Sequence, residues 1–516
     1  MFIKFFLLIL FFAVMLGVGV YCRRHASNVD GFVLGGRSVG PWLTAFAYGT
    51  SYFSAVIFVG YAGQFGWRFG IASTWIGIGN ALIGSLMAWV ILGRRTRIMT
   101  QQLNSATMPE FFGRRYGSKA LKIGASAIIF VFLIPYTASL YNGLSRLFGM
   151  AFNIDYTVCI VIMAALTGVY VIAGGYMATA INDFIQGMIM LIGIIAVIAA
   201  VLNQNGGFLN SLAELSKVND PEVSEMAGAF NSFFGPDPFS LLCVVVLTSL
   251  GVWGLPQMVQ KFYAIKSEKA IEKGTVISAL FALVVAGGCY FLGGFGRLFS
   301  DKIDIAANGY DSIIPTMLEG LSPALIGVIV ILVLSASMST LSSLVLASSS
   351  TLTLDFLKDN IIKDMDEKRQ VLVMRLLIVV FIAISVVIAI VQYKTNVTFI
   401  AQLMGISWGA LAGAFLAPFL YGLYMKRTSI AAVWCSFVFG VGIMLLNMIA
   451  PSVFPVWLRS PINCGAFAML AGMIIVPVVS LFTPKTDAKL VEFAFASYDK
   501  KVVVSVRDSL GEESEK

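Results

Sequence analysis

Long apolar runs separated by short polar connections dominate the hydrophobic pattern of this chain. A helix needs about 20 mostly apolar residues to cross a bilayer, and thirteen stretches of roughly that length can be counted. They lie near residues 2–21, 41–66, 71–93, 119–150, 156–174, 178–202, 239–262, 272–297, 320–350, 371–392, 398–425, 429–450 and 463–482. The runs lack the period-2 alternation of a membrane β-barrel, and backbone groups in lipid must be hydrogen-bonded within their own segment. The pattern predicts an all-helical integral membrane protein with 13 transmembrane helices.

Two of these stretches are interrupted at matching places. The first interruption is Gly49-Thr50-Ser51, and Gly251, which begins the second, follows Gly49 by 202 residues. A single interruption is also typical of a simple kink or of close helix packing, but a matched pair indicates inverted repeats with broken helices. The spacing predicts an anchor helix with a cytoplasmic connection, a first repeat, a second repeat, two further helices and a cytoplasmic tail, at residues 1–40, 41–238, 239–428, 429–483 and 484–516.

Composition and charge support a membrane location. Apolar residues make up 58% of the chain and charged residues 12%, against about 25% charged in an average soluble protein. Many of the 35 Lys and Arg residues lie in connections that face the cytoplasm if the amino terminus is outside, Arg94, Arg95, Lys261 and Lys266 among them. This bias follows the positive-inside rule. The lipid bilayer therefore accounts for the net charge of +8, and we expect no nucleic-acid partner.

Hydroxyl side chains are concentrated in one apolar segment, where they occupy 11 of the 19 positions from Ser335 to Thr353. Helical spacing places Ser339, Ser342 and Ser343 on one face. Several neutral oxygens can replace the water shell of a monovalent cation and still release it. The pattern favours a Na⁺ site, although hydroxyls in membrane helices also bond to their own backbone or serve as small packing residues.

Asp183 is the only acidic residue between Asp155 and Glu214, and it lies in an apolar run. A carboxylate inside a membrane is costly and is usually functional, while its place near the start of the segment also suits helix capping. The six cysteines are single and the chain has one histidine, so neither a histidine base nor a metal cluster is indicated. We expect that the protein is not an enzyme.

Five strings carry a resemblance to a known family. They are FVLGGRSVGPW (32–42), TMPEFFGRRYG (107–117), NDFIQG (182–187), GVWGLPQMVQKF (251–262) and ASMSTLSS (336–343). In this order and spacing, they resemble the sodium/solute symporter family, which includes the bacterial proline and pantothenate symporters. The resemblance implies a LeuT-like fold of two inverted five-helix repeats with one preceding and two following helices. It also implies Na⁺ as the coupling ion and a bacterial plasma membrane. Because thirteen crossings put the two termini on opposite sides, the charge bias, which places the amino terminus outside, predicts a cytoplasmic carboxyl terminus.

The resemblance further implies ligand positions. The family's main sodium site joins carbonyls of the first broken helix to a carbonyl and two hydroxyls of a later helix, and the matching positions here are Thr50, Phe53, Ala336, Ser339 and Thr340. A second sodium site found in some members would map to Asp183, Ser339, Ser342 and Ser343.

The substrate candidates are Ser54, Tyr136 and Trp253. Tyr136 and the string SRLF at 145–148 resemble the proline branch. Where that branch has an aspartate, a tryptophan and a tyrosine, this chain has Tyr52, Thr248 and Val252. The resemblance implies symport of a small organic solute, and we infer that this solute bears a carboxylate.

The expected function is Na⁺-coupled secondary active symport, which imports this solute by alternating access. Two alternatives remain open: a proton-coupled carrier of the same fold, with Asp183 as the protonated group, and a membrane sensor or channel that does not accumulate solute. No sequence pattern indicates an oligomeric state.

Overall fold

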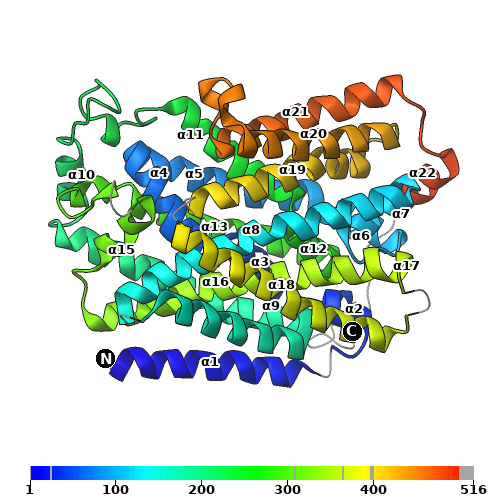
Figure 1. The fold of residues 1–516 in the computed structure, drawn as a ribbon, viewed down its shortest axis with the longest axis horizontal. Helices are drawn as coiled ribbons and strands as arrows, with labels where there is room; N and C mark the ends of the chain where they lie inside the picture. The colour runs from blue at the N-terminus through cyan, green and yellow to red at the C-terminus, as the bar shows by residue number, and fades with distance from the viewer. Residues whose placement is uncertain are drawn as a thin grey trace.

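The structure is a computed structural model that describes residues 2–23, 26–152, 154–305, 309–362, 365–395 and 400–498. The end of the predicted tail, residues 499–516, lies outside these ranges. Within them every regular element is a helix, and one isolated parallel bridge joins Val39 to Ile265. The predicted all-helical fold class is confirmed. The long helices run side by side, with α10 and α15 near one end of the molecule and α6, α7 and α22 near the other (Figure 1).

The first half of the chain contains one short break and several long helices. In order, its elements are α1 (Phe2–Cys22), α2 (Val29–Leu34), η2 (Gly35–Arg37), α3 (Pro41–Tyr52), η3 (Val56–Tyr61), α4 (Ala62–Phe69), η4 (Gly70–Ser73), α5 (Thr74–Gly79), η5 (Asn80–Met87), η6 (Trp89–Gly93), α6 (Arg94–Gln102), α7 (Met108–Tyr116), α8 (Lys119–Phe152), α9 (Tyr156–Gln204) and α10 (Phe208–Leu215). The π-helical turns η3, η5 and η6 lie inside the continuous helical run that follows the break.

The second half begins after a connection that holds one short turn. Its elements are η7 (Ala229–Asn231), α11 (Pro238–Val245), η8 (Val246–Leu250), η9 (Gly251–Gly254), α12 (Pro256–Ala264), α13 (Glu268–Gly293), η10 (Gly296–Phe299), η11 (Tyr310–Ser312), α15 (Ile313–Leu318), α16 (Pro323–Thr351), η12 (Leu352–Leu357), α17 (Lys358–Asn360), α18 (Glu367–Thr395), α19 (Ile400–Tyr424), α20 (Ile430–Ile449), η13 (Pro451–Val453), η14 (Val456–Leu458), α21 (Pro461–Phe482) and α22 (Ala488–Phe495).

Both predicted interruptions are breaks in the backbone. The first ends α3 at Phe53, which has an extended conformation with φ −99° and ψ 117°. The second lies at Leu255, with φ −86° and ψ 123°, directly before Pro256 at the start of α12. The helical segments on either side of Leu255 are bent by 48° relative to each other. Each break therefore ends a helix inside the molecule, where backbone groups need partners from elsewhere.

The predicted number of 13 crossings is not confirmed. Among the described residues, nine helices are long and apolar enough to cross a membrane, or ten if the bent pair around Leu255 is one span. The difference arises because neighbouring predicted segments are continuous. Val56–Gln102 forms one run through Gly70, and α9 continues through Gly175, whose φ of 56° is a left-handed conformation that suits glycine. The division into two repeats at residue 238 stays a prediction.

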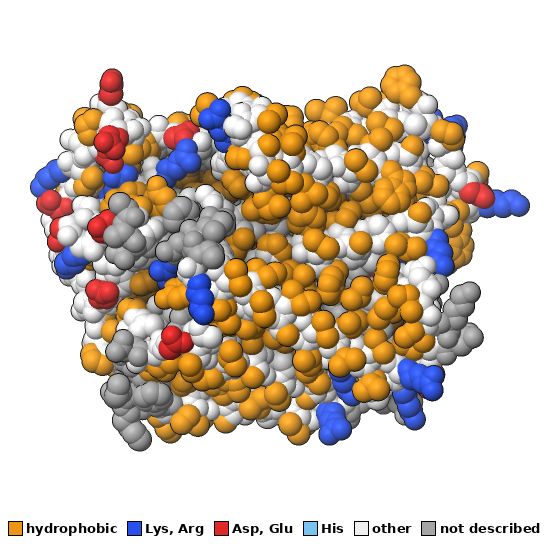
Figure 2. Space-filling model, viewed as in Figure 1, with side chains coloured by type: hydrophobic (Ala, Val, Ile, Leu, Met, Phe, Trp, Pro, Cys, Tyr) orange, Lys and Arg blue, Asp and Glu red, His pale blue; other side chains and the backbone are white. Residues whose placement is uncertain are grey.

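The molecular surface has the pattern of a membrane protein. Hydrophobic side chains cover the middle of the face in Figure 2, and charged side chains gather at its two ends. The apolar band includes large side chains that point outward, such as Ile192 at 66% exposure and Leu372 at 65%. An apolar band of this kind is stable only against lipid, so the protein is a multi-pass membrane protein.

Helix α13 approaches α4 and α5 at the level of the backbone. A Cβ atom added at Gly66 would lie 2.0 Å from the carbonyl oxygen of Gly293, and one added at Gly77 would lie 2.4 Å from the Cα of Gly287. The same helix packs on α3, where the Phe281 ring lies 5.3 Å from the Phe46 ring. Helices α3, α4, α5 and α13 therefore form one closely packed unit that holds the first break in place.

Candidate functional site

The break after α3 presents backbone oxygens to a neighbouring helix. Pro41 starts α3 and Tyr52 ends it. Thr50 turns its own hydroxyl back to Phe46 O at 2.8 Å, so its side chain stays within the helix. The carbonyls of Thr50 and Ser51 accept hydrogen bonds from Thr340 of α16, at 3.3 and 3.4 Å. The broken end of α3 is thus tied to the hydroxyl-rich helix.

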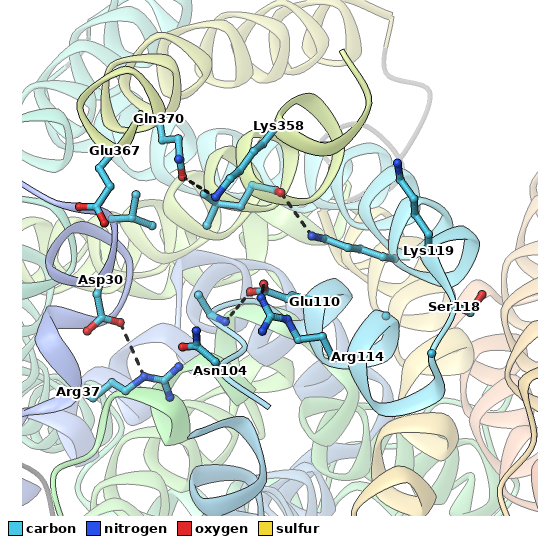
Figure 3. Close-up of a pocket in the computed structure, with 16 residues that line it drawn as sticks. Asp30, Arg37, Asn104, Glu110, Arg114, Ser118, Lys119, Lys358, Glu367 and Gln370 are labelled. Carbon is cyan, nitrogen blue, oxygen red and sulfur yellow. Dashed lines mark hydrogen bonds and ion pairs between the residues drawn. The ribbon is translucent and has the colours of Figure 1, made fainter. Parts of the chain in front are cut away.

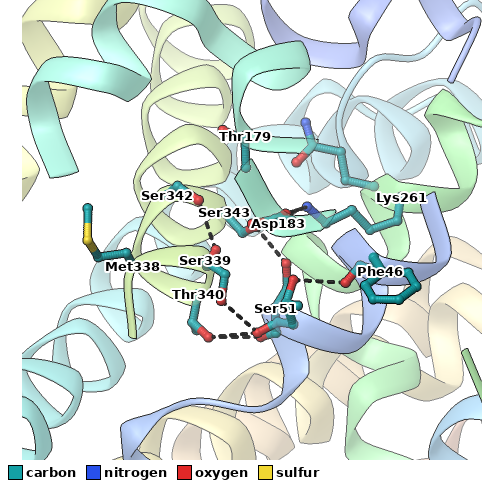
Figure 4. Close-up of polar contacts among 12 residues, drawn as sticks. Phe46, Ser51, Thr179, Asp183, Lys261, Met338, Ser339, Thr340, Ser342 and Ser343 are labelled. Carbon is teal, nitrogen blue, oxygen red and sulfur yellow. Dashed lines mark hydrogen bonds and ion pairs between the residues drawn. The ribbon is translucent and has the colours of Figure 1, made fainter. Parts of the chain in front are cut away.

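Four of the five residues predicted for the main sodium site meet at this point. Figure 4 shows two of them, Ser339 and Thr340, beside Ser51. The Ser339 hydroxyl donates to Thr50 O at 3.0 Å and to Ala336 O at 3.1 Å. The Thr340 hydroxyl also donates to Ala336 O, at 3.1 Å. Ser339, Thr340 and Thr50 have 0% exposure and Ala336 has 2%. Phe53, the fifth residue, caps the carboxyl-terminal end of α3, the helix that contains Thr50. The result is a buried group of neutral oxygens on two helices.

The residues predicted for a second sodium site also come together, but with a further partner. Ser343 Oγ lies 2.7 Å from Ser51 Oγ, and the Ser342 hydroxyl donates to Ser339 O at 2.8 Å. Asp183, on α9, has 0% exposure. The Lys261 ammonium reaches this group from α12 (Figure 4). It donates to Ser343 Oγ at 3.0 Å and lies 3.8 Å from Asp183 Oδ2.

Placing Lys261 among the charges of a cytoplasmic connection was wrong. Its side chain is 2% exposed, and it lies on α12 five residues after Pro256, which starts that helix. Arg97 and Arg115, at 0% exposure, are buried as well. A count of basic residues by position in the sequence cannot separate a charge in a loop from a charge that points inward from a helix. A basic residue close behind a break is the signal that could have found Lys261.

The three substrate candidates have different surroundings. Ser54 lies in the first break, where its side-chain oxygen accepts a hydrogen bond from Val56 N at 3.2 Å. Tyr136 packs edge-on against Trp408 of α19, with ring centres 5.9 Å apart. Trp253 donates its indole N–H to Ile83 O at 3.0 Å. The polar atom of Trp253 is therefore engaged with η5.

An aromatic wall lies beside the break, and its member Trp408 was missed in the sequence. Tyr52 stacks on Phe53 with ring centres 4.5 Å apart and on Trp408 at 5.9 Å. Trp408 contacts Tyr136 in turn, so the wall formed by these four rings connects α3, α8 and α19. Trp408 is the one aromatic residue in the string SWGALAG, and no spacing rule singles it out.

Gln257 is a second residue that the sequence did not reveal. It follows Pro256 at the start of α12 and is 1% exposed. Within the part of the chain that the structure describes, neither atom of its side-chain amide has a hydrogen-bond partner. A buried amide without partners is costly, so this side chain is suited to contact a polar ligand at the second break.

A separate cavity of about 520 Å³ lies where the ends of α2, α7, α8, α17 and α18 meet (Figure 3). Charged side chains line it, and most are paired. Arg37 lies 3.7 Å from Asp30, and Arg114 contacts Glu110 at 2.6 Å. Burial lowers the pKa of the Arg37 guanidinium, and Asp30 partly offsets this effect. The paired charges make this cavity part of the ionic network at the ends of the helices.

Comparisons with known proteins agree with this architecture. Residues 32–440 match the sequence model of the sodium:solute symporter family. The chain is 30% identical over 497 residues to a sodium/proline symporter of Staphylococcus aureus strain JH9, and the match covers 93% of this chain and 92% of that protein. The sodium/proline symporter of strain COL of the same species gives the same values.

Among solved structures, a Na⁺-coupled sialic acid symporter in a substrate-bound, outward-open state matches with a TM-score of 0.72 and 17% identity, over 94% of this chain and 99% of that one. A manganese transporter of Eremococcus coleocola matches with a TM-score of 0.51 and 13% identity, over 86% and 95%. Both likenesses concern the fold, which is that of LeuT-like transporters with broken helices.

Proposed function

The chain belongs to the sodium:solute symporter family, and on that premise we propose that Na⁺ bound at the first break drives import of a small, carboxylate-bearing organic solute. Na⁺-coupled symport is the activity of the family, and the protein is a transporter and not an enzyme. The observation that carries the proposed ion site is the meeting of the Ser339 and Thr340 hydroxyls at the Thr50 carbonyl.

The proposed Na⁺ ligands are the carbonyls of Thr50, Phe53 and Ala336 and the hydroxyls of Ser339 and Thr340. Each hydroxyl can turn its hydrogen away and offer its oxygen, because a hydroxyl is both donor and acceptor. A set of neutral oxygens holds a monovalent cation without the strong attraction of several carboxylates, so the ion can also leave. Bound Na⁺ would link α3 to α16 and stabilise the state that accepts solute.

The proposed solute site lies between the two breaks, at Ser54, the aromatic wall and Gln257. The start of α12 carries the partial positive charge of a helix amino terminus, which favours a carboxylate. The wall suits an apolar part of the solute, and the Gln257 amide offers both a donor and an acceptor. Because the curated relatives include sodium/proline symporters, proline is the first solute to test, followed by pantothenate.

Alternating access accounts for accumulation. Rocking of the unit that holds α3 against the rest of the molecule would expose the site to each side in turn. One charge that moves through about 100 mV contributes roughly 2.3 kcal/mol, and a tenfold Na⁺ gradient adds about 1.4 kcal/mol. Together these terms allow about 500-fold accumulation of a neutral solute. The proposed location is the bacterial plasma membrane, with the amino terminus outside and the carboxyl terminus in the cytoplasm.

Uptake into proteoliposomes tests the proposal. Purified protein is reconstituted, and accumulation of radiolabelled proline, pantothenate and other small carboxylates is measured with an inward Na⁺ gradient. Replacing Na⁺ by choline at fixed pH should abolish accumulation. Accumulation of a labelled solute that is equal in both buffers would contradict Na⁺ coupling.

A proton-coupled carrier is the second candidate function, and the buried Asp183 carboxylate is the observation that favours it. A proton gradient imposed in choline buffer would drive uptake in that case. Counterflow of labelled solute separates either carrier from a sensor or a channel, because only a carrier exchanges labelled for unlabelled solute against a gradient.

A further inference from the structure

The cluster formed by Asp183, Ser343, Ser51 and Lys261 joins four helices in the interior of the protein. These residues come from α9, α16, α3 and α12 in that order. All four side chains are at least 96% buried. The cluster contains the positions predicted for a second Na⁺, and it already holds a positive charge.

We propose that the Lys261 ammonium is the resident cation of this cluster, in the place of a second Na⁺, so that the protein binds one Na⁺ ion per solute. This inference rests on the proposed function and concerns the number of ions. The evidence is geometric: Lys261 Nζ lies 3.0 Å from Ser343 Oγ and 3.8 Å from Asp183 Oδ2.

Charge balance supports this assignment. Asp183 is one buried carboxylate, and Lys261 is one buried ammonium beside it. Buried charges are stable when they are paired, and a third charge without a partner is costly. A Na⁺ ion in the cluster would lie close to an ammonium that cannot leave, since Lys261 is anchored in α12. The repulsion between the two cations would weaken binding of the ion.

The hydroxyl oxygens of the cluster are already engaged in other contacts. Ser343 Oγ already contacts both the Lys261 ammonium and Ser51 Oγ. Ser342 donates its hydroxyl to Ser339 O, and Ser339 contributes to the main site. Because Na⁺ needs several oxygens to replace its water shell, a second ion would depend on the two Asp183 carboxylate oxygens, which have no hydrogen-bond partner among the described residues. The Lys261 ammonium already lies 3.8 Å from one of these oxygens.

The ammonium also links neighbouring helices, as an ion bound in this cluster would. It lies on α12, directly after the second break, and reaches Asp183 of α9 and Ser343 of α16. The Ser343 hydroxyl continues the chain of contacts to Ser51 of α3, next to the first break. Lys261 therefore connects both broken helices to their neighbours with a charge that is never released, so it adds nothing to the energy available for accumulation.

Direct measurement of bound ions tests the proposal. Equilibrium binding of ²²Na⁺ to the purified full-length protein should saturate at one ion per chain with a Hill coefficient of one. Two ions per wild-type chain would overturn the proposal. If no binding is lost on replacing Ser339 and Thr340 together by alanine, the proposed ion site itself fails, and this result is distinct from a wrong ion count.

Variants of Lys261 provide a second test, in which the number of bound ²²Na⁺ ions is compared with that of the wild type. Lys261→Met keeps a side chain of similar length without the charge, and Asp183 should then accept a second ²²Na⁺, so that binding rises to two ions per chain. Lys261→Arg, which keeps the charge, should stay at one. The pair Lys261→Met with Asp183→Asn should return to one. A Lys261→Met protein that elutes as a folded species and still binds a single ion would contradict the proposal.

Discussion

The hydroxyl of Ser339 lies 3.0 Å from the carbonyl oxygen of Thr50, a residue 289 positions earlier in the chain. This contact joins the broken end of α3 to the middle of α16. Since both atoms are buried, the pair is positioned by the fold and not by chance contact at a surface.

The first prediction concerns this contact. Replacing Ser339 and Thr340 together by alanine removes two of the five proposed Na⁺ ligands. A hydrogen bond to a charged group is typically worth about 1.5 to 3 kcal/mol, and we take the loss of each ligand to weaken Na⁺ binding by a similar amount. We expect the apparent affinity for Na⁺ to fall by at least about 100-fold, measured as the Na⁺ dependence of solute uptake. The matched control is Ser337→Ala, because Ser337 donates to Val333 O of its own helix at 2.8 Å. An unchanged Na⁺ affinity in the double variant would rule out the site.

The second prediction concerns the buried pair of Asp183 and Lys261. Asp183→Asn leaves the Lys261 ammonium buried without its carboxylate, and breaking a buried ion pair on one side typically costs about 3–5 kcal/mol. We expect a clear fall in the thermal unfolding temperature of the detergent-purified protein. Adding Lys261→Met to Asp183→Asn should restore most of the loss. If the single and the double variants unfold at the same temperature, the two charges are not coupled.

The third prediction concerns the contact between α4 and α13. Gly66→Ala places a Cβ atom 2.0 Å from Gly293 O, so the two backbones must separate. Overpacking of this kind typically costs about 1–3 kcal/mol. We expect reduced thermal stability together with slower uptake. Gly442→Ala is the control, because nothing lies within 4 Å of its added Cβ. Equal stability of the two variants would show that the helices can move apart at no cost.

The fourth prediction concerns pH. Asp311 lies in η11, outside the membrane-spanning helices, and accepts a hydrogen bond from Ile400 N at 3.3 Å. Burial raises the pKa of the Asp311 carboxyl to about 6. A carboxyl with a raised pKa in the folded state contributes stability that is fully present below its unfolded pKa and is lost as pH rises through about 6.

The size of this effect follows from linkage. From an unfolded pKa near 3.9 to a folded value of about 6, the loss amounts to about 3 kcal/mol. We expect Asp311→Asn to remove this contribution, so that the difference in stability between pH 4.5 and 7.5 becomes smaller than in the wild type. An equal pH dependence in both proteins, followed by thermal unfolding, would contradict the prediction.

Much of the architecture could be predicted from the sequence, because membrane helices are recognisable by their length and apolar composition. Two interruptions were also predictable, because Gly49 and Gly251 each lie four residues before one of the backbone breaks, at Phe53 and Leu255. The number of membrane crossings was harder to predict. Gly70 and Gly175 turn the chain without ending its helical run, so length alone does not separate neighbouring spans.

The candidate site was predictable in part. Ser339 and Thr340 stood out because eleven hydroxyls crowd one apolar helix. Lys261 and Trp408 did not, since their importance depends on which helices pack against theirs. A lysine at the end of an apolar run has the same sequence pattern whether it points to solvent or, as here, to Asp183 and Ser343.

The contacts of Gly66 with Gly293 and of Gly77 with Gly287 have a mechanical consequence. Where two backbones touch, there are no side chains between them to bend or to exchange rotamers, so any displacement of α4 or α5 carries α13 along with it. A displacement at one end of α4 or α5 is therefore transmitted to α13 as the movement of one rigid unit.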